Sequence, residues 1–181
     1  MLFRSLIVID LQRGILAYPT VHPIGEVVQK ASALADAFRG HSLPVVLVRA
    51  TGRPAGRTEQ ARNLGELPAG FANLLPELNQ QPEDHIVTKR TSGAFTNADL
   101  QAHLDRLGVT QVVIAGVSTS NGVEATARHA YALGYNVTLA VDAMTDTNLD
   151  SHVNSVTRIF PKIGETGATR KIVDLLERRN A

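Results

Sequence analysis

The sequence predicts an α/β protein whose parallel sheet is covered by helices on both faces. Five short aliphatic runs alternate along the chain with longer segments whose apolar residues recur at helical spacing. The runs are continuously apolar, which is typical of strands that are buried on both faces. Glycine follows two of the helical segments, at Gly108 and Gly134, where a left-handed C-cap favours this residue.

The elements follow one another in a regular order. The predicted strands are residues 6–9, 44–48, 85–87, 111–115 and 137–141. The predicted helices are residues 24–39, 98–107, 122–133 and 167–179. A further apolar run at residues 159–163 precedes the last helix, and we expect it to form the last strand of the sheet.

Length and composition exclude several classes of protein. The chain has 181 residues, a formal net charge of +1 and no cysteine. This length is typical of one domain, and we expect residues 1–181 to form one. Balanced charge argues against nucleic-acid binding, and no apolar stretch near the start is long enough to cross a membrane. We therefore expect a cytoplasmic protein without membrane segments, disulfides or a thiol nucleophile.

Residues 50–70 interrupt the alternation of strands and helices. The segment contains three arginines, Arg53, Arg57 and Arg62, among glycines and prolines, with no clear period. Long connections of this kind are lids, binding loops or solvated insertions. Because ligands bind beyond the carboxyl ends of parallel strands, and this segment follows the second strand, we expect it to close over a site. At least one of its arginines is then expected to reach the ligand or a neighbouring subunit.

Two charged residues follow predicted strands at the same edge of the sheet. Asp10 ends the first strand, and Lys89 lies just past the third. Taken singly, Asp10 can be a turn cap and Lys89 a solvated surface cation. Taken together they can form a site, because a carboxyl group in a partly apolar environment can act as an acid. A lysine beside it can set its charge state and bind an anionic substrate.

The turn at residues 116–122 connects the fourth strand to a helix. Thr119 or Ser120 can cap a helix that begins near Asn121, where free N–H groups can bind a carboxylate or an oxyanion. A simple capped turn is the alternative. The turn is neither a Walker A loop nor a dinucleotide-binding fingerprint. We interpret the six histidines, at positions 22, 41, 85, 103, 129 and 152, as surface or packing residues, and we expect no metal and no cofactor.

Three motifs in chain order resemble the isochorismatase-like hydrolase family of the cysteine hydrolase superfamily. They are Ile7-Val8-Ile9-Asp10-Leu11-Gln12, then Thr88-Lys89 with Gly93-Ala94-Phe95, then Val113-Ile114-Ala115-Gly116-Val117-Ser118-Thr119 running into Val123-Glu124-Ala125-Thr126. The likeness extends to about Asp142. It implies a Rossmann-like three-layer α/β/α sandwich with six mostly parallel strands, and a homo-oligomer, either a dimer or a tetramer. It also implies that an Asp, a Lys and a Cys meet at the strand ends, the first two being Asp10 and Lys89.

The cysteine of this trio is missing. In the family's amidohydrolases the turn reads like Gly-Val-x-Thr-x-x-Cys-Val, and counting from Gly116 places the cysteine at Gly122. Glycine cannot attack an amide, so the cysteine acyl-enzyme mechanism is not available. True isochorismatases resemble this chain in having glycine at this position while retaining the Asp and the Lys.

The resemblance to true isochorismatases implies hydrolysis of a vinyl ether without a covalent intermediate. Protonated Asp10 would give a proton to the terminal methylene carbon of an enolpyruvyl group, Lys89 would orient the substrate, and water would add to the oxocarbenium ion. The residues expected to bind the substrate beside this pair are Gln12, Arg53, Arg57, Val117 and Ser118. Ser118 stands where that branch has tyrosine, so the identity of the small anionic substrate stays open.

Three hypotheses about function follow. The first is a cofactor-free hydrolase that uses Asp10 and Lys89 on a small anionic substrate, with a vinyl ether as one candidate. The second is a hydrolase in which Ser118 or Ser120 replaces the thiol, which is disfavoured because neither falls at the nucleophile position and no histidine is placed to activate a hydroxyl. The third is a catalytically silent member that serves as a binding or assembly protein. The lost cysteine favours the third hypothesis, and the retained Asp10 and Lys89 disfavour it.

Overall fold

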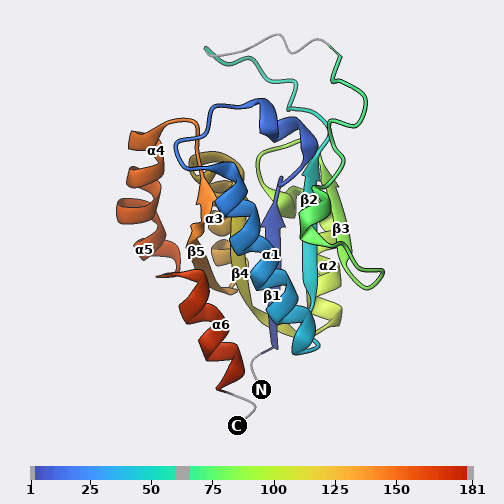
Figure 1. The fold of residues 1–181 in the computed structure, drawn as a ribbon, viewed down its shortest axis with the longest axis vertical. Helices are drawn as coiled ribbons and strands as arrows, with labels where there is room; N and C mark the ends of the chain where they lie inside the picture. Colours follow the sequence, from blue (N-terminus) through green and yellow to red (C-terminus); the bar gives the residue numbers. More distant parts are fainter. Residues whose placement is uncertain (1–2, 60–65, 179–181) are drawn as a thin grey trace.

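The computed structural model describes residues 3–59 and 66–178, which form a six-stranded sheet between two layers of helices (Figure 1). The strands are β1 (Phe3–Ile9), β2 (Val45–Ala50), β3 (His85–Lys89), β4 (Val109–Val117), β5 (Asn136–Thr145) and β6 (Glu165–Gly167). They lie in the order β3-β2-β1-β4-β5-β6, and every neighbouring pair is parallel. The predicted three-layer α/β/α sandwich is confirmed.

Helices and single helical turns connect the strands. The α-helices are α1 (Ile24–Gly40), α2 (Ala98–Arg106), α3 (Glu124–Ala132), α4 (Leu149–Asn154), α5 (Phe160–Ile163) and α6 (Thr169–Glu177). The 3-10 turns are η1 (Arg13–Ala17), η2 (Pro76–Leu78) and η3 (Ala94–Thr96), and the π-helical turns are η4 (Thr119–Val123) and η5 (Ser155–Ile159). Within the described ranges, no helix is long and apolar enough to cross a membrane.

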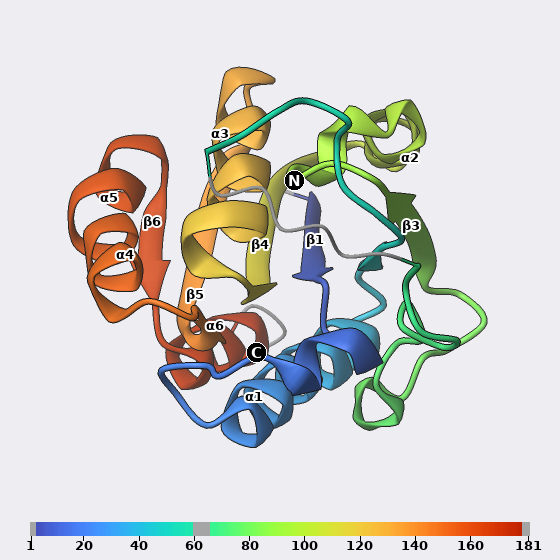
Figure 2. The same ribbon diagram turned by 90° about the horizontal axis from the view of Figure 1, so that it is seen from above.

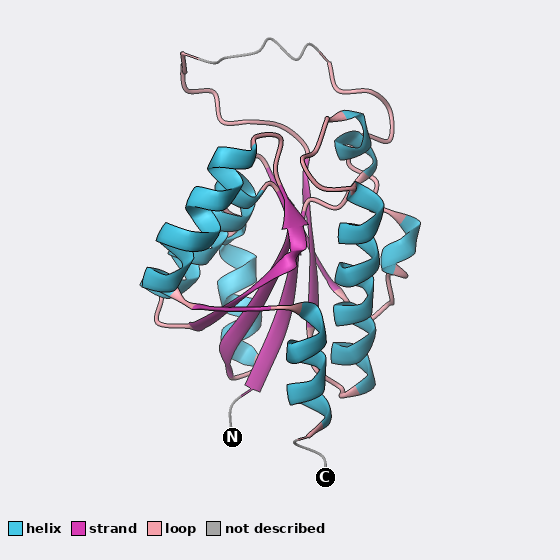
Figure 3. Cartoon of the chain, turned by 60° about the vertical axis from the view of Figure 1, so that its left-hand side comes forward, coloured by secondary structure: helices cyan, strands magenta, loops and turns pink. Residues whose placement is uncertain are grey.

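The two faces of the sheet bury alternate side chains of the same strands. Leu6 and Val8 of β1 pack toward α1 and α6, and Ile7 and Ile9 pack toward α2 and α3. Figure 2 shows α1 and α6 on one side of the sheet and α2 and α3 on the other, and Figure 3 shows the sheet between two layers of helices. Because both faces are covered, β1 is continuously apolar, as the sequence pattern predicted.

The strand order places a topological switch point between β1 and β4. From β1 the sheet grows through β2 and β3 on one side, and through β4, β5 and β6 on the other. Ile9, the last residue of β1, lies in register with Gly116 of β4. In open α/β sheets, ligands bind beyond the carboxyl ends of the strands at such a point. The residues that follow β1 and β4 therefore begin side by side where a site is expected.

The contact between β1 and β4 depends on Gly116. Its φ is +114°, and a Cβ at this position would lie 2.1 Å from the carbonyl oxygen of Ile9. Residues other than glycine rarely adopt this conformation, and here they also lack space. Gly108 and Gly134, with φ of +64° and +90°, follow α2 and α3, which confirms both predicted left-handed C-caps.

The prediction of a strand at residues 159–163 is wrong. These residues close η5 and form α5, and the last strand is β6, which has three residues. Ile159, Phe160 and Ile163 also have the spacing of one helix face, and Phe160 and Ile163 are buried against the α2 and α3 side of the sheet. Periodicity does not distinguish a strand from a helix in so short an apolar run, and β6 is too short and polar to be recognised from the sequence.

Replacing Gly116 by alanine is expected to reduce the free energy of unfolding by about 3 kcal/mol or more, because backbone strain adds to a steric overlap. Gly108→Ala is the matched control, since its φ is also positive at +64° but, apart from its two chain neighbours, no described residue has an atom within 4 Å of its Cβ position. That control is expected to lose about 1–2 kcal/mol. Urea denaturation measures both losses, and equal losses would contradict the packing argument at Gly116.

Candidate active site

Asp10 and Lys89 form an ion pair at the carboxyl edge of the sheet. Lys89 Nζ donates a hydrogen bond of 2.7 Å to Asp10 Oδ2 and one of 3.0 Å to the carbonyl oxygen of Thr91. The side chains of Lys89 and Asp10 are 3% and 15% exposed. The structure therefore brings together two residues that are 79 positions apart in the sequence, and Lys89 is not a solvated surface cation.

Asp10 occupies an unusual position after β1. Its φ is +50°, in the left-handed region, which aspartate tolerates better than most residues. Its amide donates to the carbonyl oxygen of Val48, so the backbone at this position is fixed to β2. One carboxyl oxygen bonds Lys89, while Oδ1 is buried and has no hydrogen-bond partner in the described part of the chain. A strained residue with an unsatisfied buried oxygen is typical of functional sites.

Burial raises the pKa of Asp10 above its ordinary value of 3.8, because the carboxylate loses hydration. The charge of Lys89 and its hydrogen bond lower the pKa without cancelling this effect. A raised pKa means that the folded protein favours the protonated carboxyl group. The contribution of Asp10 to stability is therefore complete below pH 3.8 and is lost as the pH rises through the folded pKa.

Gly122 faces the same carboxyl group. A Cβ at this position would lie 3.5 Å from Asp10 Oδ2, 3.0 Å from Ile9 Cγ2 and 3.1 Å from the carbonyl oxygen of Val117. A side chain at position 122 would thus point toward the pair of Asp10 and Lys89. The three positions that the sequence analysis assigned to one site lie together in the structure.

The turn between β4 and α3 becomes helical earlier than predicted. The helical segment starts with η4, and the amides of Asn121 and Val123 both donate to the carbonyl oxygen of Ser118. Ser118 occupies the N-cap position, and its side chain makes no capping hydrogen bond. The predicted cap by Thr119 or Ser120 is therefore wrong, because the hydroxyl groups of both residues bond side chains outside the turn.

Two residues that the sequence analysis did not assign to the site fix this turn. The amide and the hydroxyl of Ser120 both donate to Asp146 Oδ2 at 2.8 Å. His152 Nδ1 lies 2.8 Å from Thr119 Oγ1, whereas the hydroxyl of Ser120 bonds Asp146 and not a histidine. His152 is on α4, 33 positions from Thr119, and such a contact leaves no local pattern. Asp146 could have been found, because it follows β5 at the same edge as Asp10.

The structure gives Gln12 a structural role, and its contact with a substrate stays a prediction. The side chain is buried, its Oε1 accepts a hydrogen bond from the amide of Ala50, and its Nε2 donates to the carbonyl oxygens of Ala50 and Phe71. Gln12 thus connects the end of β1 to both ends of the long segment after β2. The side chain of Val117 is likewise part of the core, and its carbonyl oxygen is the group near Gly122.

The segment after β2 extends beyond the carboxyl edge of the sheet (Figure 1). Arg53 and Arg57 are both exposed on it. Arg62, the third arginine of the expected lid, lies outside the described residues. The segment therefore starts on the correct side of the sheet, and closure over Asp10 stays a prediction.

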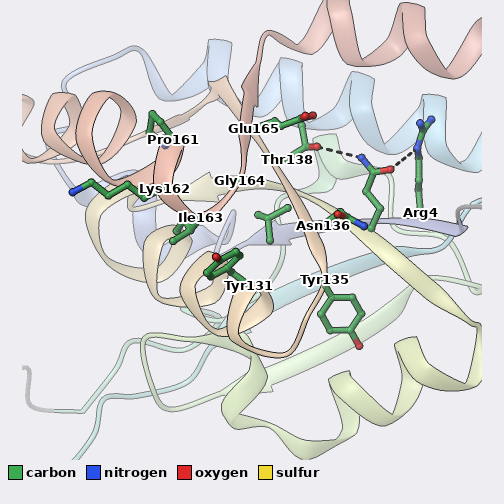
Figure 4. Close-up of a pocket in the computed structure, with 12 residues that line it drawn as sticks. Arg4, Tyr131, Tyr135, Asn136, Thr138, Pro161, Lys162, Ile163, Gly164 and Glu165 are labelled. Carbon is green, nitrogen blue, oxygen red and sulfur yellow. Dashed lines mark hydrogen bonds between the residues drawn. The ribbon is translucent and has the colours of Figure 1, made fainter.

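Other potential ligand sites do not involve these residues. A cavity of about 450 Å³ lies at the opposite, amino edge of the sheet, between α3, α5 and the starts of β5 and β6 (Figure 4). Polar groups along it bond one another, since Arg4 Nε donates to Gln111 Oε1 and Gln111 Nε2 donates to Thr138 Oγ1. In the described part of the chain, no group of three or more His, Asp or Glu side chains could bind a metal ion. The carboxyl edge therefore remains the candidate active site.

Removing the charge of Lys89 is expected to raise the pKa of Asp10 further. A carbon-13 NMR titration of the carboxyl group should give a midpoint above 3.8 in the unmodified protein, and a higher one in Lys89→Met. Lys30→Met is the matched control, because Lys30 pairs with a different carboxylate, that of Asp142, at 3.7 Å, and Lys89 is the cation that lowers the pKa of Asp10. A midpoint at or below 3.8 in the unmodified protein would show that the attraction of Lys89 outweighs burial.

Comparison with known proteins identifies the family of the chain. The chain matches the isochorismatase domain over residues 4–171. The isochorismatase family protein YecD of Escherichia coli O157:H7 is 38% identical over 181 residues, which cover 95% of each protein. A solved isochorismatase family protein from Burkholderia thailandensis is 37% identical with a TM-score of 0.91, covering 96% of this chain and 95% of that one.

Hydrolases are among the relatives. A streptothricin hydrolase from Streptomyces noursei is 32% identical over 148 residues, which cover 77% of this chain and 49% of that protein. The domain match and the full-length similarity to YecD both include the strands that carry Asp10, Lys89 and the turn of Gly122. The chain therefore belongs to the isochorismatase family.

Proposed function

We propose that this protein is a cofactor-free hydrolase of a small anionic substrate, with a vinyl ether as the favoured class. The observation that supports the proposal is the carboxyl group of Asp10, whose Oδ2 bonds Lys89 while the buried Oδ1 has no partner among the described residues. Burial raises the pKa of this group, which increases the protonated fraction that can act as a general acid.

The proposed reaction needs one acid and one water molecule. Protonated Asp10 gives its proton to the terminal methylene carbon of an enolpyruvyl ether, and the electron pair of the double bond forms the new C–H bond. Water adds to the oxocarbenium ion and returns a proton to the Asp10 carboxylate. The resulting hemiketal then collapses: its hydroxyl group loses a proton as the C=O bond forms, the C–O bond to the leaving group breaks, and the departing oxygen takes up a proton. The products are pyruvate and the alcohol.

Lys89 orients both the acid and the substrate in this proposal. Its ammonium group has three N–H donors, and Asp10 and Thr91 accept two of them. The third donor can bind an anionic group of the substrate. We propose that Ser118 lines the same site, and that Arg53 and Arg57 bind a substrate carboxylate when the segment after β2 folds over the edge. A homo-oligomer of one-domain chains in the cytoplasm is part of the same proposal.

The composition of the turn favours this chemistry over acyl transfer. The chain has no cysteine, and position 122 next to Asp10 is glycine. The hydroxyl of Ser120 donates to Asp146, and this contact disfavours Ser120 as a replacement for the missing cysteine nucleophile. A mechanism without a covalent intermediate needs no nucleophilic side chain from the turn.

Asp10→Asn is expected to lower kcat/KM for a vinyl-ether substrate by about 10²–10⁴-fold, because the amide has no proton to give. Pyruvate release from isochorismate is measured for the purified protein, together with hydrolysis of simple amides. Asp36→Asn is the matched control, since Asp36 is an exposed partner of Arg39 and should not affect the rate. Amide hydrolysis without pyruvate release would contradict the proposed reaction, and no turnover of either class would favour a catalytically silent protein.

A cysteine introduced at Gly122 is expected to be reactive. The start of a helical segment and the nearby Lys89 both stabilise a thiolate, and an ionised Asp10 opposes them. We expect the first two effects together to outweigh the third, so the thiol pKa should fall below the ~8.5 of free cysteine. The rate of iodoacetamide alkylation against pH reports this pKa, because Gly122→Cys supplies the only thiol of the chain. Gly25→Cys lies on the first turn of α1, where no described residue outside the adjacent chain of the helix comes within 4 Å of the Cβ position. This variant measures the effect of a helix end alone.

To support the site, the pKa of the thiol at position 122 must be lowered more than that of the control thiol. Its Cβ would lie 3.0 Å from Ile9 Cγ2, so the variant is also expected to lose about 1–3 kcal/mol of stability through overpacking. A slow alkylation profile without any shift would show that position 122 is not the nucleophile position of the family. The assignment of the turn would then be incorrect.

A further inference from the structure

Buried polar contacts connect the turn of Gly122 to α4. Thr119, the first residue of η4, is fully buried, and its hydroxyl lies 2.8 Å from Nδ1 of the buried His152. Next to it, Ser120 donates twice to Asp146, which is also buried. The turn is therefore fixed from outside by two side chains that follow β5.

His152 is in turn supported by a second histidine. The ring centroids of His22 and His152 are 4.7 Å apart in an edge-on arrangement. His22 Nδ1 lies 3.1 Å from Thr145 Oγ1, and the backbone amide of His22 donates to the same oxygen. The segment before α1 is thus hydrogen-bonded to the end of β5 and is in ring contact with α4, which bonds the turn.

The neutral form of His152 suits this arrangement. Burial and the neighbouring His22 lower the pKa of His152, although the charge of Asp146 opposes them. A neutral imidazole has one donor and one acceptor nitrogen, so it can bond a hydroxyl in either direction. Because Thr119 is fully buried, its hydroxyl does not contact a substrate. Its bond to His152 can therefore act on the site only through the position of the turn.

We propose that His152, acting through Thr119, is a positioning residue that holds η4 against Asp10 and limits the access of water to that carboxyl group. Gly122 is on the same turn as Thr119, and its Cβ position is 3.5 Å from Asp10 Oδ2. Loss of the bond would leave a buried hydroxyl or imidazole unpaired, which favours a shift of the turn. Such a shift would let water reach the carboxyl group of Asp10. Only the expected effect of His152 on turnover rests on the proposed function. The hydration of Asp10 can be measured without any assay of activity.

Four variants test the proposal. Thr119→Val removes the hydroxyl with little change of shape, His152→Leu removes the imidazole, and the double variant removes both. Both single variants are expected to move the NMR midpoint of Asp10 down toward 3.8, because hydration reverses the effect of burial. The double variant should move it no further than either single variant. His152→Asn, which keeps a hydrogen-bonding group near Nδ1, should restore most of the original midpoint.

The same variants are assayed for pyruvate release. If the proposed function is correct, kcat should fall about 10- to 100-fold in both single variants while KM changes little, because the acid is misplaced and the binding residues are not. His103→Leu is the matched control, since His103 stacks on His85 with ring centroids 3.8 Å apart and should not affect Asp10.

The outcomes separate the two proposals. An unchanged or raised Asp10 midpoint in folded Thr119→Val protein would overturn the positioning role, whatever the activity. Independent, additive shifts in the double variant would also overturn it, since the two residues would not act through one bond. A lowered midpoint in a protein that releases no pyruvate would support the positioning role and contradict the proposed function.

Discussion

The close approach of β1 and β4 at their carboxyl ends determines where the candidate site can lie. Ile9 is in register with Gly116, and the carbonyl oxygen of Ile9 occupies the space that a Cβ would need. Because the two strands are in contact here, Asp10 and the turn of Gly122 leave the sheet as neighbours. The candidate site is thus a consequence of backbone packing at the switch point of an open parallel sheet.

The chemistry of the site depends on two opposing effects on the pKa of Asp10, which burial raises and Lys89 lowers. A carboxyl group in this position loses hydration, and a buried ion pair recovers only part of that cost. The result is a carboxyl group with a raised pKa, a backbone in the left-handed region and one oxygen without a partner in the described chain. Such features reduce stability, and they are concentrated where a protein binds or reacts.

Residues outside the ion pair keep this arrangement in place. Gln12 bonds the backbone at both ends of the long segment after β2, and Asp146 bonds the turn that carries Gly122. These side chains are buried and have hydrogen-bond partners, whereas Asp10 Oδ1 has none among the described residues. The rigid surroundings can therefore maintain an unfavourable environment at a single carboxyl group.

The sequence by itself determined the fold class and the central pair of the site. Continuous apolar runs are a local property of buried parallel strands, and Asp10 and Lys89 were identified because each follows such a run. The tertiary structure alone decided the contact of His152 with Thr119, the structural use of Gln12 and the helical state of residues 159–163. Contacts between residues more than 30 positions apart depend on the path of the chain between them, and a short apolar run fits either a strand or a helix until its neighbours pack against it.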